Sequence, residues 1–315
     1  MTKTAIFARI NKLISAFWMY IKQAQMYLFK KVSDLQKHLD KLRNGGSSIG
    51  LVPTMGALHE GHLSLIDMAK ADNDIVVTSI FVNPTQFNQP EDLIKYPRTS
   101  AKDIEVLTIH GNDVLFMPAV EEVYPEGLNT KLDLDFEQLD KTMEGEFRPG
   151  HFDGMTQVVN RLGNIVQAHK MYFGQKDFQQ YAIVQNMLKQ LNSPIKLIMC
   201  PIIREEDGLA LSSRNIRLKA DIRQKATIIY QTLLKAKSLI KENNPELIKT
   251  MALNELSIKD FKPDYFEIVD GNSLISIDDY KSSDFIVACT AVWAGDVRLI
   301  DNMILKHQKK IATTF

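Results

Sequence analysis

From about residue 27 onward, the chain alternates between short apolar runs and longer stretches in which hydrophobic residues recur at helical spacing. The apolar runs predict strands at residues 27–29, 49–52, 74–82, 114–117, 171–173 and 195–200. The stretches between them predict helices at residues 32–42, 59–69, 100–109, 155–168 and 176–191. Repeated strand–helix units of this size imply an α/β fold with a parallel sheet and right-handed crossovers.

The pattern changes after about residue 203. Two helices are predicted at residues 219–242 and 245–256, followed by strands at 265–269, 285–291 and 297–300. A short loop with Gly295 and Asp296 joins the last two strands, which indicates a β-hairpin. We therefore expect a larger α/β domain over residues 26–202 and a smaller α+β domain over residues 203–315.

The first 25 residues stand apart from both domains. Up to residue 32 the chain has six basic residues and no acidic one. Hydrophobic residues from Ile6 to Ile21 recur at helical spacing, which gives a basic amphipathic stripe. Such a segment fits an interfacial membrane helix, a targeting segment or a helix packed on the protein's own surface. We favour a fourth interpretation, in which translation starts at Met26.

Composition narrows the class of protein. The 315 residues are 45 % hydrophobic and 24 % charged, with a formal net charge of zero. Because the chain has no excess of positive charge, electrostatics gives no reason to expect nucleic acid or an acidic polymer as the partner. No apolar run approaches the roughly 18–20 residues needed to span a bilayer. The only cysteines, Cys200 and Cys289, have no disulfide or metal-site spacing, so a reducing cytoplasm is the economical location.

Candidate chemistry begins with His59-Glu60-Gly61-His62, which follows a strand and opens a helix. Histidines at i and i+3 share one helix face. Both lie in the first turn, where free N–H groups and the helix dipole favour anions. This arrangement predicts a site that handles phosphate, and the alternative is an ordinary pair of surface histidines. The interpretation as a zinc site is less favoured, because helical zinc ligands of this type need i, i+4 spacing.

Other polar clusters also follow predicted strands: Asn83 with Gln86, then residues 174–180, then residues 211–214. Amide side chains suit a ligand with hydroxyls and a carboxylate, and lysine, arginine and serine suit a triphosphate. Open parallel sheets bind ligands at the carboxyl ends of their strands, so we expect the clusters to converge. Residues 144–152 mix both charge signs with glycines and are typical of a mobile lid. Taken singly, ordinary turns, helix caps and exposed loops explain each of these segments as well.

Together these motifs resemble the pantothenate synthetase (pantoate–β-alanine ligase) family of the nucleotidyltransferase superfamily. The resemblance covers the chain from about Met26 to its end. It rests on VPTMGALHEGH at 52–62, FVNPTQF at 81–87, YPRT at 96–99, GQKD at 174–177, GLALSSRN at 208–215, DYF at 264–266 and RLIDN at 298–302.

The resemblance implies a Rossmann-like N-terminal domain, a smaller C-terminal domain that closes over ATP, and a homodimer. It implies that the carboxylate of (R)-pantoate attacks the α-phosphate of Mg-ATP, which gives pantoyl adenylate and pyrophosphate. The amine of β-alanine then displaces AMP to form pantothenate.

The resemblance also implies roles for individual residues. Catalytic roles fall on His62, as proton donor or leaving-group stabiliser, and on His59, Lys176, Ser212, Ser213 and Arg214. ATP contacts are expected at Met55, Gly56, Ala57, Leu58, His59, Glu60, Gly61, His62, Gly174, Gln175, Lys176, Asp177, Ile203, Leu211, Ser212, Ser213 and Arg214. Pantoate is expected to bind Gln86, Gln180 and Asn83, and β-alanine to bind Gln86, Glu144 and Arg148. Asp103 is a candidate carboxylate for Mg²⁺.

Two other functions remain open from the residues alone. A nucleotidyltransferase with the same histidine motif and a different acceptor would release pyrophosphate without needing an amine substrate. A binding module would bind nucleotide without turnover. The pair Gln86 and Gln180 favours a small hydroxy acid as the substrate.

Overall fold

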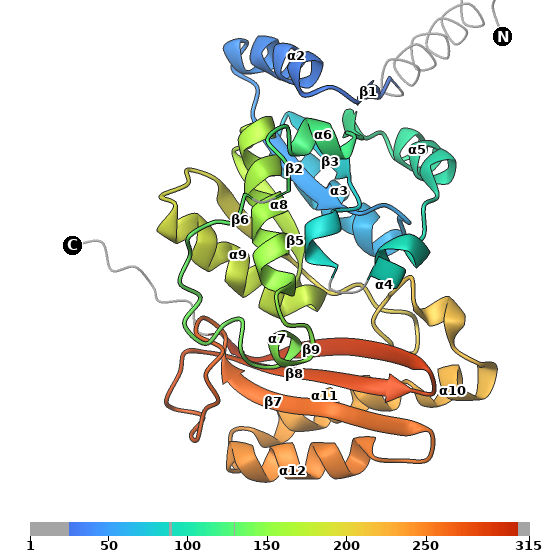
Figure 1. Cartoon of the computed structure of the whole chain (residues 1–315). Helices are drawn as coiled ribbons and strands as arrows, with labels where there is room; N and C mark the ends of the chain where they lie inside the picture. Colours follow the sequence, from blue (N-terminus) through green and yellow to red (C-terminus); the bar gives the residue numbers. More distant parts are fainter. Residues whose placement is uncertain (1–24, 88–89, 129, 308–315) are drawn as a thin grey trace, which may run out of the picture.

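Two β-sheets organise the residues that the computed structural model describes, 25–87, 90–128 and 130–307. A six-stranded parallel sheet forms the N-terminal half, and a three-stranded antiparallel sheet lies below it in the C-terminal half (Figure 1). The interpretations of residues 1–24 lie outside the described residues. No helix within the described ranges is long and apolar enough to cross a membrane.

The six parallel strands follow the predicted apolar runs. They are β1 (Tyr27–Phe29), β2 (Ile49–Thr54), β3 (Ile75–Ile80), β4 (Val114–Phe116), β5 (Lys170–Gly174) and β6 (Lys196–Cys200). Their order is β1-β4-β3-β2-β5-β6, and all paired neighbours are parallel, which confirms the predicted sheet. The central strands β2, β3 and β4 are almost wholly buried, as expected where both faces of a sheet are covered.

Helices cover both faces of this sheet. The longer ones are α2 (Val32–Asn44), α3 (Glu60–Asp72), α5 (Ser100–Ile109), α8 (His151–Val166) and α9 (Phe178–Gln190). The shorter ones are η1 (Pro84–Gln86), α4 (Pro90–Lys95), α6 (Val120–Val123), α7 (Glu144–Phe147) and η2 (Gln175–Asp177). α3 and α5 pack into one apolar core, and α2, α8 and α9 pack into another. α8 begins four residues before its predicted start, because His151 and Phe152 are buried with the rest of that helix.

The strand order reverses at β2. The chain continues from β2 to β3 and β4 on one side, whereas β5 pairs with the other edge of β2. The helices that follow β2 and β5 consequently pack on opposite faces of the sheet. Open α/β sheets bind ligands where connections diverge in this way. The two diverging turns carry His59 and Lys176.

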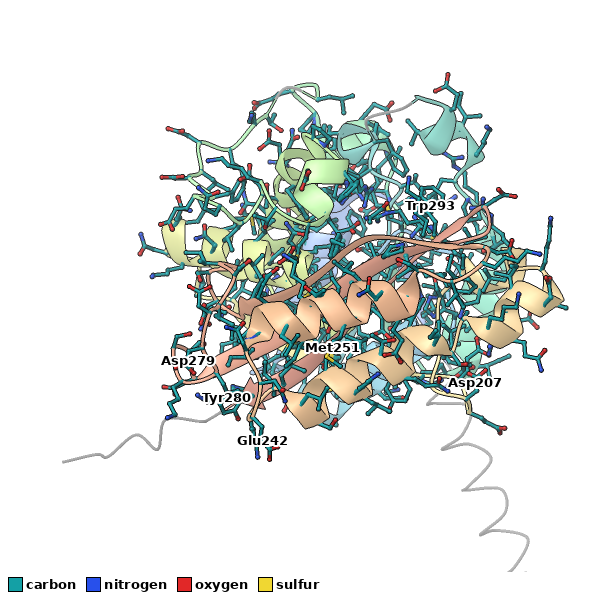
Figure 2. The ribbon with its side chains drawn as sticks, turned by 90° about the horizontal axis from the view of Figure 1, so that it is seen from below. Asp207, Glu242, Met251, Asp279, Tyr280 and Trp293 are labelled. Carbon is teal, nitrogen blue, oxygen red and sulfur yellow. The ribbon has the colours of Figure 1, made fainter. Side chains whose placement is uncertain are left out.

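The C-terminal half is an antiparallel sheet with helices on one face. Its strands, in spatial order, are β7 (Phe261–Asp270), β8 (Phe285–Ala294) and β9 (Val297–His307). Its helices are η3 (Asn215–Arg217), α10 (Ala220–Lys225), α11 (Ile228–Leu239) and α12 (Pro245–Leu256). Figure 2 shows α11 and α12 lying across the sheet, with Trp293 at the end opposite Asp279 and Tyr280. A separate apolar core joins these helices to the sheet.

Some boundaries in this half differ from the prediction. The helix expected at residues 219–242 is two helices, α10 and α11, separated at Ala226 and Thr227. β9 extends to His307 instead of ending near residue 300. Its second part carries the buried polar residues Asp301 and Asn302, which obscure the apolar pattern of a strand. The predicted hairpin between β8 and β9 is confirmed.

Candidate active site

A cavity of about 370 Å³ lies between the two halves of the chain. Residues expected to bind substrates line one side of it: Glu144, Arg148, Lys176, Asp177, Gln180 and Arg214. The three-stranded sheet supplies the facing side with Tyr265, Cys289, Trp293, Arg298, Ile300 and Asn302. The predicted clusters at residues 144–152, 174–180 and 211–214 therefore converge, as expected for one site.

The two histidines cap the start of α3 and are not among the residues that line this cavity, although the charge of Lys176, which does line it, acts on both rings. His59 precedes the helix in an extended conformation, and its Nδ1 accepts a hydrogen bond from the Gly61 N–H at 3.1 Å. His62 Nδ1 accepts from the backbone N–H of His59 at 3.3 Å. A Cβ at Gly61 would lie 2.8 Å from His59 Cε1, so a larger residue there would displace the His59 ring. Glu60 is exposed in the first turn, where its charge favours the positive end of the helix dipole.

These hydrogen bonds define the protonation of both rings. A ring nitrogen that accepts from a backbone N–H carries no proton, so Nε2 is the protonated donor of each neutral ring. Burial, with smaller effects from the charges of His59 and Lys176, lowers the pKa of His62 to about 3. Burial and the charge of Lys176 also lower the pKa of His59. Each ring is therefore neutral at pH 7, and each offers an Nε2–H to an anion. Of the two roles expected for His62, stabiliser of the leaving group fits a neutral ring better than proton donor.

We expect the His62 ring to show no titration between pH 5 and pH 8 in the free protein, as followed by NMR of the imidazole nitrogens. The ring is neutral in the folded protein down to about pH 3. In the unfolded chain it takes up a proton with a pKa near 6.5. Its burial therefore reduces the free energy of unfolding progressively as the pH falls below 6.5. A midpoint near pH 6.5 for His62 in the folded protein would contradict this description.

Asp103 supports the turn that precedes the histidines. It is 2 % exposed, and its carboxylate accepts hydrogen bonds from the Leu58 N–H at 2.9 Å and the Ala57 N–H at 3.1 Å. The Thr99 hydroxyl donates to the same carboxylate at 3.2 Å. Within the described part of the chain, no three His, Cys, Asp or Glu side chains are grouped to hold a metal. Both carboxylate oxygens of Asp103 thus accept hydrogen bonds from the protein, and its role as a Mg²⁺ ligand stays a prediction. Its role in this structure is to hold the turn expected to contact ATP.

Gln86 occupies a buried position at the start of the loop after β3. Its Oε1 accepts from Asn83 Nδ2 at 3.3 Å, and its Nε2 donates to Met55 Sδ at 3.2 Å. Asn83 is fully buried, and its side chain also bonds to the Gly154 carbonyl at 3.0 Å and the Tyr124 hydroxyl at 2.9 Å. Asn83 thus orients Gln86. A direct contact between Asn83 and pantoate, as expected from the sequence, would require it to exchange one of these bonds.

Helix α8 supports the Gln86 segment by direct backbone contact. A Cβ at Gly154 would lie 2.1 Å from the Thr85 carbonyl oxygen, so no other residue fits there. His151, which lines the cavity, donates from Nδ1 to the Gln86 carbonyl at 2.9 Å. Burial, together with the charge of Arg148, lowers the pKa of His151 to about 4. The sequence offered no role for His151, which the structure identifies as a neutral donor behind Gln86.

The segment from Ile203 to Arg214 lies at the junction of the two halves. The Leu211 N–H donates to the Ile203 carbonyl at 2.9 Å, which closes the base of the loop. Ser212 Oγ accepts from the Arg214 N–H at 3.2 Å and so shapes the turn that brings Arg214 to the cavity. Ser212 lines a smaller adjoining cavity, whereas Ser213 is exposed and lines neither. The structure thus places Arg214 and Ser212, but not Ser213, against these cavities.

Glu144 is paired with a residue from the opposite half. Its carboxylate receives two hydrogen bonds from Arg298, at 2.8 and 2.9 Å, and one from the Tyr265 hydroxyl at 3.0 Å. Arg298 also pairs with Asp264 at 2.7 Å. Figure 1 shows the corresponding approach of α7 to β8 and β9. Burial alone would raise the pKa of Glu144, but Arg298 outweighs burial and lowers it. The charged form of Glu144 is therefore the stable one in the folded protein.

The cavity has an excess of positive charge. Arg148, Lys176 and Arg214 line it and make no ion pair with any carboxylate of the described chain. Arg298 is neutralised by Glu144 and Asp264. Arg148 and Lys176 are half-buried and Arg214 is exposed. Cations without ion-pair partners favour anionic ligands, and guanidinium groups suit carboxylates and phosphates in particular. The arrangement fits a polyanion together with a carboxylate.

Comparison with known proteins agrees with this description. The family model described as pantoate-beta-alanine ligase matches residues 27–304. The pantothenate synthetase of Phocaeicola vulgatus is 49 % identical over 285 residues, which cover 89 % of this chain and 100 % of that protein. The pantothenate synthetase of Bacteroides fragilis is 46 % identical over 283 residues, which cover 90 % of this chain and 100 % of that protein.

Solved structures are similar in fold as well. The pantothenate synthetase of Thermus thermophilus superposes with a TM-score of 0.82 at 38 % identity, covering 89 % of this chain and 100 % of that chain. The pantoate-beta-alanine ligase of Francisella tularensis, complexed with beta-gamma ATP and β-alanine, superposes with a TM-score of 0.73 at 34 % identity. That match covers 89 % of this chain and 98 % of that chain.

Proposed function

Because the chain belongs to the pantoate–β-alanine ligase family, we propose that it uses ATP to join (R)-pantoate to β-alanine through a pantoyl-adenylate intermediate. The predicted family and the predicted Rossmann-like fold with a smaller C-terminal α+β part are confirmed. The proposal includes a cytoplasmic location, which the free and buried Cys200 and Cys289 support. It also includes a homodimer, which rests on the family resemblance alone.

The unpaired cations of the cavity are the observation that carries this proposal. A carboxylate is a poor nucleophile toward a triphosphate, because both are anionic. Lys176 and Arg214 lie in one cavity without ion-pair partners in the described chain and can offset this repulsion. We propose that the two neutral histidines at the start of α3 add N–H donors, which stabilise charge without a proton transfer.

In the first step, a carboxylate oxygen of pantoate forms a bond to the α-phosphorus of ATP. The bond from that phosphorus to the bridging oxygen breaks, and pyrophosphate leaves with the electron pair. We assign the Nε2–H groups of His59 and His62 to the departing phosphate oxygens, and Lys176, Arg214 and Ser212 to the phosphates during the transfer. We propose that Mg²⁺ arrives bound to ATP phosphates, because Asp103 is engaged with the backbone.

Binding of the first two substrates involves both halves of the chain. We assign pantoate to Gln86 and Gln180, which can pair with its hydroxyls and carboxylate. We assign the ribose to Asp177. The remaining nucleotide contacts are proposed at residues 55–62, 174–176, Ile203, Leu211 and Ser213.

In the second step, the neutral amine of β-alanine attacks the acyl carbon of pantoyl adenylate. The bond from that carbon to the AMP oxygen breaks, AMP leaves as the anion, and the new amide nitrogen loses a proton. We propose that Arg148 holds the β-alanine carboxylate beside Glu144. Closure of residues 203–315 over residues 26–202 would keep water from the adenylate.

The decisive experiment follows both products in the wild-type protein. With ATP and pantoate alone, we expect release of about one pyrophosphate per site, because the adenylate stays bound. Continuous AMP formation should begin only when β-alanine is added. Pyrophosphate release that does not depend on pantoate would contradict the proposal and favour a nucleotidyltransferase with another acceptor. Nucleotide binding without either product would indicate a binding module.

A further inference from the structure

Asn302 on β9 makes a dense set of contacts with the loop after β5. Its Nδ2 donates to the carbonyl oxygens of Gln175, at 2.8 Å, and Lys176, at 3.0 Å. Its Oδ1 accepts from Gln175 Nε2 at 3.0 Å. Asn302 is only 2 % exposed, so water has little access to its amide. One side chain of the C-terminal sheet thus fixes two consecutive peptide groups of the N-terminal half.

Asn302 is itself held firmly. Asp301, its neighbour, accepts two hydrogen bonds from Arg204, at 2.6 and 2.9 Å. Arg204 also donates to the Asn302 carbonyl at 3.3 Å, and its guanidinium lies 4.2 Å from the Tyr230 ring centroid. The Asn302 N–H donates to Asp301 Oδ1 at 2.8 Å. The position of the amide is therefore determined by its own strand and by the segment that joins the two halves.

The loop that carries Lys176 has little other support. It forms the 3₁₀ helix η2, whose first residues receive no side-chain cap. In the described structure, no other side chain bonds to the carbonyls of Gln175 and Lys176. Lys176 lines both the main cavity and the smaller one next to it. Its ammonium group therefore takes its position from a backbone that Asn302 holds.

We propose that Asn302 is a positioning residue, which fixes Lys176 for the transfer of the adenylyl group. This inference rests on the proposed function. Asparagine suits the task because its amide offers two donors and an acceptor at one point, matching two carbonyls and one N–H. Aspartate keeps the acceptor and loses both donors, and leucine of similar size loses all three bonds.

Asn302→Leu and Asn302→Asp test the proposal against a matched control, Thr290→Val. Thr290 is 1 % exposed, lies on β8 opposite Asp301, and donates one partly buried hydrogen bond to the Tyr265 carbonyl. We expect pantoate-dependent pyrophosphate release to fall about 10–100-fold in both Asn302 variants, since small misplacements of this kind have such costs. The loss should affect kcat and kcat/KM for ATP equally. The control should lose some thermal stability and keep its rate.

A double variant separates positioning from a general loss of stability. If Asn302 acts through Lys176, Asn302→Leu should reduce the rate little further in a Lys176→Ala protein. Hydrogen exchange should also be faster at residues 174–177 in Asn302→Leu than in Thr290→Val. The inference would be overturned if the rate losses of Asn302→Leu and Lys176→Ala multiply in the double variant. It would also be overturned if the Asn302 variants react as fast as Thr290→Val. If the wild type shows no pantoate-dependent pyrophosphate release, the proposed function fails instead, and the exchange measurement still tests the contact.

Discussion

A His62→Ala protein is expected to release pyrophosphate from ATP and pantoate about 10²–10³-fold more slowly than the wild type. Alanine removes the Nε2–H donor that we assign to the departing phosphate. The fold should survive, because the ring of His62 makes one long backbone hydrogen bond, at 3.3 Å, in the described structure. Loss of such a cap costs about 0.5–2 kcal/mol. Rapid-quench measurement of pyrophosphate, with melting temperature followed by circular dichroism, checks both parts.

Two further substitutions separate the helix cap from the phosphate donor. His62→Asn places an amide oxygen near the position of Nδ1, which preserves the cap but does not reach the position of Nε2. His62→Gln extends an amide N–H toward the position of Nε2. We expect the Asn variant to be as slow as the Ala variant, with a melting temperature close to wild type, and the Gln variant to regain part of the rate. A large fall in melting temperature with little change in rate would instead make His62 a structural residue.

An Arg298→Met protein is expected to lose about 3–5 kcal/mol of unfolding free energy, because breaking a buried ion pair leaves its partner uncompensated. Here two carboxylates are left, Glu144 and Asp264, whose side chains are 13 % and 9 % exposed. The same change should raise the KM for β-alanine, since the Glu144 loop carries Arg148. Denaturant unfolding and steady-state kinetics provide the two measurements.

The pH dependence of this loss has a definite sign. In the wild type, Arg298 holds the pKa of Glu144 below its usual value despite burial. The corresponding stability is present above the unfolded pKa of about 4.3 and is lost as the pH falls through the folded pKa. In the variant, burial without Arg298 favours the protonated acid. The difference in stability should therefore be largest near neutral pH and should shrink below about pH 4.

A surface ion pair provides the control for that experiment. Lys235 pairs with Glu255 on the helical face of the C-terminal half, with side chains 49 % and 29 % exposed. Lys235→Met should change the unfolding free energy by at most about 1 kcal/mol, because exposed pairs contribute little. An Arg298→Met protein no less stable than Lys235→Met would contradict the importance of the buried network.

Local sequence patterns predicted the parallel sheet, the order of its strands and helices along the chain, and one side of the cavity. Apolar runs located the parallel strands, and polar residues after those strands identified the segments of Lys176 and Arg214, which line the cavity. Each of these signals lies within a short stretch of chain, where periodicity and strand ends carry the information.

The facing side of the cavity was not predictable in the same way. Arg298 meets Glu144 across 154 positions, and Asn302 meets Gln175 across 127. Such contacts depend on how two sheets dock, which no local pattern encodes. Buried polar residues also weakened the signal of β9 itself, because Asp301 and Asn302 interrupt its apolar alternation. The RLIDN motif supported the family resemblance, but sequence alone gave no reason for its polar residues.

Gly154 limits how the substrate range of this enzyme could be altered. It places the backbone of α8 against the segment that carries Gln86, with no side chain between them. A larger hydroxy acid therefore cannot be accommodated by trimming a residue at this contact, because there is no side-chain volume to remove. Redesign would have to shift the helix or change Gln86 itself. The same contact has no rotamers to freeze, so we expect the segment to which we assign pantoate to be ordered before the substrate arrives.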